Sequence, residues 1–131
     1  MKHIARLFLA LTVASLLLIG PAAAHVRTAS TKLSLKAEDT TVHKGDQVVL
    51  TAHLKSDWKK CYSNRRVKLF RYGTKVSYDS TNSQGIAVFK FDAQYTAKWQ
   101  VQFTGRQWGT HPHSHTCLAS QSQTIKIVVK K

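Results

Sequence analysis

Apolar and polar residues alternate along most of the chain after residue 24, and no segment shows the helical period of 3.6 residues. Trp99, Val101 and Phe103, for example, alternate with lysine and glutamine. This pattern is typical of strands in antiparallel sheets that bury one face and expose the other to water. The seven predicted strands are 31–36, 46–54, 66–72, 75–80, 85–91, 98–103 and 123–130.

Turn-forming sequences separate several of these strands. HKGD (43–46), YGTK (72–75) and TNSQG (81–85) combine glycine with residues that favour turns. Seven short strands at this spacing predict an all-β protein, most simply a β-sandwich over residues 31–131. A small β-barrel has the same periodicity and remains an alternative. Residues 25–30 are predicted to be a flexible lead-in.

The first 24 residues have the three parts of a secretory signal peptide. Lys2 and Arg6 precede the apolar run 7–20, and the small-residue sequence PAAA ends at Ala24. The run is too short to span a bilayer comfortably, so we expect no transmembrane segment. The sequence predicts cleavage after Ala24, which makes His25 the first residue of a secreted, extracellular protein without a lipid anchor.

The predicted mature chain is strongly basic. Without Lys2 and Arg6 it has 18 Lys and Arg residues against 6 Asp and Glu residues, a formal charge of +12. Such a charge favours anionic partners, including phospholipid headgroups, phosphate-bearing wall polymers and acidic sugars. The alternative is that the excess charge only keeps a small protein in solution. At 107 residues the mature chain is the size of one domain with one modest core.

The chain contains two cysteines, Cys61 and Cys117. Outside the cell two cysteines most simply form one disulfide. The bond would close a loop of about 57 residues, which contributes roughly 4 kcal/mol of stability if its effect is on the entropy of the unfolded chain. That is a large share of the stability expected for a domain of this size.

The segment GTHPHSHTC (109–117) places His111, His113 and His115 at every second position before Cys117. If the backbone is extended, all four side chains lie on one side, because side chains alternate along a strand. Imidazoles that converge in this way bind copper or zinc. A free α-amine on His25 would add a Cu(II) chelate with its own ring.

Two other interpretations of the histidines stay open. The segment is equally consistent with a polar, exposed loop that Cys117 holds in place. It is also consistent with a pH switch, because histidines that are neutral near pH 7 gain positive charge near pH 5. No cofactor other than copper or zinc is expected.

A second candidate surface lies in segment 55–75, where basic and aromatic residues are interleaved. Such a combination binds phosphate-bearing polymers and stacks on sugar rings or bases. The alternative is a solvated loop followed by an ordinary strand. Trp108, beside the histidine segment, extends the same surface. The candidate residues are Trp58, Lys59, Lys60, Arg65, Arg66, Lys68, Arg71 and Trp108.

Four stretches of the chain resemble a known group of domains: VHKGDQVVLTAHL, RVKLFRYGTKVSYDSTNSQGIAVFKF, AKWQVQFTG and SQSQTIKIVVK. They are similar to the immunoglobulin-like sandwich modules of secreted bacterial proteins, notably actinobacterial ones. Asn82 stands where the turn of those modules usually has aspartate, and both residues favour such turns. The resemblance covers about residues 31–131 and implies an immunoglobulin-like antiparallel β-sandwich of about seven strands.

The resemblance also implies where the two cysteines lie. They fall between the second and third strands and between the sixth and seventh, unlike the core disulfide of antibody domains. In an immunoglobulin-like topology these two connections emerge at the same end, and the start of the chain commonly lies nearby. We therefore expect the disulfide, the histidine segment and His25 to meet at one end of the sandwich.

The sequence contains none of the motifs of nucleophilic catalysis or phosphate-cradling loops, so we expect no enzymatic activity. The predicted function is that of a secreted, monomeric binding module whose basic surface contacts an anionic cell-envelope polymer or an extracellular protein. Nucleic acid is not the expected physiological partner. The alternatives are capture of copper or zinc by the histidines, and a purely structural module.

Overall fold

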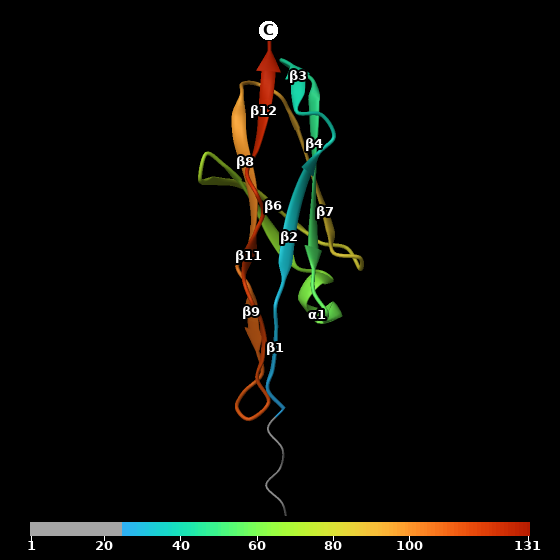
Figure 1. Ribbon diagram of the computed structural model, residues 1–131, viewed down its shortest axis with the longest axis vertical. Helices are drawn as coiled ribbons and strands as arrows, with labels where there is room; N and C mark the ends of the chain where they lie inside the picture. Colours follow the sequence, from blue (N-terminus) through green and yellow to red (C-terminus); the bar gives the residue numbers. More distant parts are fainter. Residues whose placement is uncertain (1–24) are drawn as a thin grey trace, which may run out of the picture.

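A computed structural model of the protein describes residues 25–131, and the predicted signal peptide, 1–24, lies outside the described residues. The predicted immunoglobulin-like antiparallel β-sandwich with one disulfide is confirmed (Figure 1). Its elements are β1 Arg27–Ala29, β2 Lys32–Ala37, β3 Thr41–His43, β4 Gln47–Lys55, α1 Lys59–Tyr62, β5 Arg66–Arg71, β6 Thr74–Ser80, β7 Ile86–Asp92, β8 Ala97–Phe103, β9 Arg106–Trp108, β10 His115–Cys117, β11 Ser120–Gln121 and β12 Ile125–Lys130.

Two separate sheets form the sandwich, so the barrel alternative is wrong. One sheet has the order β2-β4-β7, and the other has the order β3-β12-β8-β5-β6 with β11 also paired to β8. The pairs are antiparallel except for β3 with β12 in this sandwich and β1 with β10 beyond it. Each of the seven predicted strands is present, shifted by no more than two residues at either end.

The core lies between the two sheets and follows the predicted alternation. In β4, Val48, Leu50, Ala52 and Leu54 are buried, while the residues between them are partly exposed. Because successive side chains of a strand point to opposite faces, one face of β4 packs inward along its whole length. The facing sheet contributes Val67, Leu69, Trp99, Val101, Phe103 and Ile127.

Five strands were not predicted, and all of them are short. The strands β1, β3, β9, β10 and β11 contain two or three residues each. An alternating pattern needs about four residues to be recognised, so periodicity does not reveal strands of this length. These strands form through pairing with partners that are distant in the sequence.

The expectation of a flexible lead-in over residues 25–30 is wrong for residues 27–29, which form strand β1. Strand β1 pairs in parallel with β10, with Ala29 opposite Cys117. The carbonyl oxygen of Ala29 accepts a hydrogen bond of 2.9 Å from the backbone N–H of Leu118, and the Ala29 side chain is buried. Pairing with a segment almost 90 residues away therefore orders residues 27–29, near the start of the predicted mature chain.

The turn 81–85 forms as predicted. The side-chain oxygen of Asn82 accepts hydrogen bonds from the backbone N–H groups of Gln84 and Ile86. Gly85 has a φ of +82°, and a β-carbon at this position would collide with the backbone carbonyl oxygen of Leu54. Glycine is therefore required in this turn both for its backbone conformation and for the close approach of β4.

No helix within residues 25–131 is long and apolar enough to cross a membrane.

Candidate functional site

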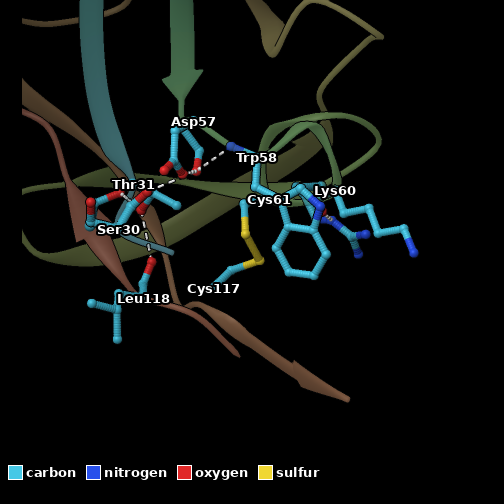
Figure 2. The surroundings of a disulfide bond; sticks show 11 residues. Ser30, Thr31, Asp57, Trp58, Lys60, Cys61, Cys117 and Leu118 are labelled. Atoms are coloured by element: carbon cyan, nitrogen blue, oxygen red, sulfur yellow. Dashed lines mark hydrogen bonds between the residues drawn. A yellow bond between two sulfur atoms is a disulfide. The ribbon is translucent and has the colours of Figure 1, made fainter. Parts of the chain in front are cut away.

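The disulfide joins two connections at one end of the sandwich. Cys61 in α1 is bonded to Cys117 in β10, with 5.5 Å between the Cα atoms, and both residues are buried. The bond holds α1, with Trp58 just before it, close to β10 (Figure 2). We call the end formed by α1, β1, β9 and β10 the disulfide pole; it lies at the bottom of Figure 1.

A small sheet of order β1-β10-β9 extends the sandwich at this pole (Figure 1). Strands β9 and β10 form a hairpin that places His115 opposite Trp108. Strand β1 lies on the other side of β10 and places Arg27 opposite His115. The register therefore places a cation, an imidazole and an indole, from Arg27, His115 and Trp108, in one row across the sheet.

Two tryptophans and a histidine pack against one another on this sheet. The rings of Trp58 and Trp108 are stacked, with 5.2 Å between their centroids, and His115 contacts both rings at 5.4 and 5.6 Å. All three residues are half-buried. The Nδ1 atom of His115 is buried and has no hydrogen-bond partner. We call these three residues the tryptophan cluster.

Four cationic side chains surround the tryptophan cluster. The guanidinium of Arg27 lies 4.4 Å from the centroid of a Trp58 ring, and the ammonium of Lys60 lies 5.8 Å from it. The guanidinium groups of Arg65 and Arg106 lie 5.6 and 6.0 Å from a Trp108 ring. Cations are attracted to the faces of indole rings at these distances. We call these four residues the pole cations.

No carboxylate neutralises the pole cations. In residues 25–131 the one contact within 4 Å between a basic and an acidic side chain joins His43 to Asp46, in β3 and the following turn at the far end of the molecule. Asp57 is next to the tryptophan cluster in sequence, but the hydrogen bond of its carboxylate is with the hydroxyl of Ser56. The site therefore presents positive charge whose counter-charge must come from solvent ions or a ligand.

Arg65 is the most constrained of the pole cations. Its Nε–H donates a hydrogen bond of 2.6 Å to the carbonyl oxygen of Lys60, which fixes the guanidinium beside Trp108. Partial burial, and secondarily the positive charge of Arg106, lower the pKa of Arg65. An arginine nevertheless stays protonated at physiological pH, so two repelling guanidinium groups are held near one ring.

The structure divides the predicted basic and aromatic surface among several places. Trp58, Lys60, Arg65 and Trp108 come together at the disulfide pole, as described above. Lys59 is exposed on α1. The remaining three are on β5, where Arg66 lies over Tyr78, Lys68 pairs with Tyr78 and Gln102 across the sheet, and Arg71 lies over Tyr95.

Sequence reasoning missed two of the pole cations, Arg27 and Arg106. Arg27 lies in the predicted lead-in, and Arg106 belongs to a three-residue strand. One signal was available for Arg106, because it stands two residues before Trp108 and shares its side of an extended segment. No comparable local signal exists for Arg27, whose position depends on the pairing of β1 with β10.

The histidine segment is not extended throughout, so the predicted line of four side chains is wrong. Residues 111–113 form a turn in which the N–H of His113 donates to the carbonyl oxygen of Thr110 at 2.7 Å, and β10 begins only at His115. His115 belongs to the tryptophan cluster, and His111 is exposed. Within residues 25–131 no three histidines, cysteines or acidic residues are grouped to hold a metal.

A groove of about 490 Å³ lies elsewhere, between β6 and β7, with Phe89, Phe91 and Trp99 among its lining residues. Its acidic and basic residues are mixed, with Asp79 and Asp92 beside Arg71 and Lys90. The groove therefore lacks the uniform charge of the disulfide pole. The candidate site is therefore distinguished by its uniform positive charge and its aromatic residues, and not by the presence of a cavity.

No protein-family model matches the chain, and no curated protein matches its sequence. The resemblance to secreted bacterial modules accordingly stays a prediction.

Proposed function

We propose that the protein is a secreted binding module, without enzymatic activity, whose disulfide pole contacts an anionic polymer of the cell envelope. The observation that carries the proposal is the set of four cations around two stacked tryptophans with no carboxylate partner. The intramolecular disulfide is compatible with the extracellular location that this function requires.

The arrangement of the pole cations favours a ligand with several negative charges. Arg27 and Lys60 lie over one tryptophan, and Arg65 and Arg106 lie over the other. Arginine guanidinium groups match phosphate and carboxylate oxygens with two parallel hydrogen bonds. A polymer that carries a charge on each unit can contact these groups one after another, whereas a small anion reaches only one or two.

The rigidity of the site also favours binding. The disulfide, the pairing of β1 with β10 and the stacking of Trp58 on Trp108 fix the backbone and rings that support the cations. Less side-chain freedom is lost on binding when the groups are already positioned. The overall charge of the mature chain adds a long-range attraction that speeds encounter with polyanions.

The test is binding of the mature protein to long-chain inorganic polyphosphate, followed by tryptophan fluorescence at several salt concentrations. We expect affinity to fall steeply with salt because binding releases condensed counterions. The double variant Arg27→Ala/Arg106→Ala should bind at least about tenfold more weakly at 50 mM salt and show a salt slope smaller by about 2.

The matched control is Lys36→Ala/Lys130→Ala, which removes the same charge from exposed positions on β2 and β12. We expect this variant to lose less than about threefold in affinity. Equal losses in the two double variants would show attraction to net charge alone, and would reject the disulfide pole as the site. Binding that is independent of salt, or no binding to polyphosphate, would favour an extracellular protein as the partner.

A further inference from the structure

His25 and His113 lie side by side at the edge of the disulfide pole. The parallel register of β1 and β10 pairs Arg27 with His115, and two residues earlier the same register places His25 opposite His113. The N–H of Arg27 donates to the carbonyl oxygen of Ser114 at 3.1 Å, which continues the pairing beyond β10. The two imidazole rings are stacked, with 5.6 Å between their centroids and 19° between their planes.

The turn that precedes β10 fixes the backbone of His113. Its N–H bonds the carbonyl oxygen of Thr110. Gly109 has a φ of +84°, and a β-carbon there would collide with the carbonyl oxygen of His113. The disulfide at Cys117 anchors the other end of the segment. His113 is therefore held by backbone contacts on both sides, while its side chain is exposed.

Cleavage after Ala24 would add a third nitrogen to this pair. The new α-amine of His25 and the Nδ1 atom of the same residue close a six-membered chelate ring on a metal. Amine and imidazole nitrogens in a tetragonal arrangement are ligands that suit Cu(II), which also binds nitrogen sites more tightly than other divalent first-row metals do. We propose that the mature N-terminus binds one Cu(II) through the amine and ring of His25 and the ring of His113.

This site differs from the predicted set of three alternating histidines. His115 is excluded because its ring packs against both Trp58 and Trp108 and its Nδ1 atom is buried. His111 is exposed and has no ring contact with His25 or His113. The ligands are instead the ring and the α-amine of His25 and the ring of His113. Only two side chains are needed, because cleavage after Ala24 supplies the third nitrogen.

The copper site and the polyanion site have opposite electrostatics. Arg27 is two residues from His25 on the paired strand, and its positive charge, with the net positive charge of the chain, repels a divalent cation. Added salt screens this repulsion, so copper affinity should rise or stay constant with ionic strength while polyanion affinity falls. The inference shares with the proposed function only secretion with cleavage after Ala24, and the opposite salt dependences distinguish failure of one from failure of the other.

The experiment is calorimetric titration of Cu(II) into mature protein whose first residue, His25, has been verified by mass spectrometry. We expect one copper per chain, with nitrogen hyperfine splitting in the electron paramagnetic resonance spectrum. Acetylation of the His25 α-amine should weaken binding at least about 100-fold because it removes a ligand and breaks the chelate. His113→Ala should weaken it at least about tenfold.

The matched control is His111→Ala, in the same turn, which should bind Cu(II) within about threefold of wild type. Equal affinity of the acetylated protein, or equal losses in the His111 and His113 variants, would contradict the inference. So would tighter binding of Zn(II) than of Cu(II), or a secreted protein whose first residue is not His25. Circular dichroism of each variant distinguishes a lost ligand from a lost fold.

Discussion

Replacement of both Cys61 and Cys117 by alanine should lower the free energy of unfolding by about 4 kcal/mol, because the bond closes a loop across a sequence separation of 56 residues. Freed from this cross-link, the unfolded chain gains conformational entropy that the native state does not share. Both side chains are also fully buried, so their loss leaves unfilled space. Urea denaturation at equilibrium measures the change.

Two comparisons separate the cross-link from the lost sulfur atoms. Reduction of the wild-type disulfide keeps both side chains and should reproduce most of the destabilisation. If the reduced protein were as stable as the oxidised one within about 0.5 kcal/mol, the unfolded-chain explanation would be wrong. Because Cys117 anchors β10, we also expect reduction to weaken polyphosphate and copper binding together.

Leu50→Ala should cost about 3 kcal/mol of folding free energy, within the 2–5 kcal/mol range typical of buried leucines. Leu50 is completely buried in β4, opposite Phe89 of β7, and its inner face meets the second sheet. Alanine removes three carbon atoms from a closely packed region that cannot collapse, since the disulfide and the sheet pairing hold both layers. Thermal unfolding, followed by circular dichroism, should show a clearly lower melting temperature.

Val88→Ala is the matched control for this substitution. Val88 is in β7, paired with Thr51 of β4 beside Leu50, but its side chain is 40% exposed. We expect a loss below about 1 kcal/mol, from reduced strand propensity and little lost packing. Similar losses at the two positions would mean that the core is not centred on the inner face of β4.

The long strands were predictable because their side chains alternate over enough residues to define a face. Strand β4 shows this over nine residues, with every second one buried. Strand β1 has three residues, and what orders it is the hydrogen bonding of Ala29 and Arg27 to a segment far along the chain. Local sequence contains no information on such pairing, so a flexible lead-in was the natural prediction.

The candidate site was only partly predictable, because nearness in sequence groups residues correctly only where the chain stays in one place. Nearness in sequence grouped Lys60 and Arg65 correctly, because α1 and the residues after it stay at the disulfide pole. It grouped Arg66 and Arg71 wrongly, since β5 leads away along the sheet and ends beside Tyr95. The histidines failed as a group because the turn at Gly109–His113 interrupts the extended backbone on which their alignment depended.

The start and the end of the described chain lie at opposite ends of the long axis, with β1 at the disulfide pole and β12 running to the far tip (Figure 1). A tag or carrier attached before His25 would lie at the disulfide pole and would leave no free α-amine for the proposed copper site. Attachment after Lys131 leaves both candidate ligand sites facing solution, so a protein tethered to a bead or sensor surface through that residue would display the disulfide pole outward.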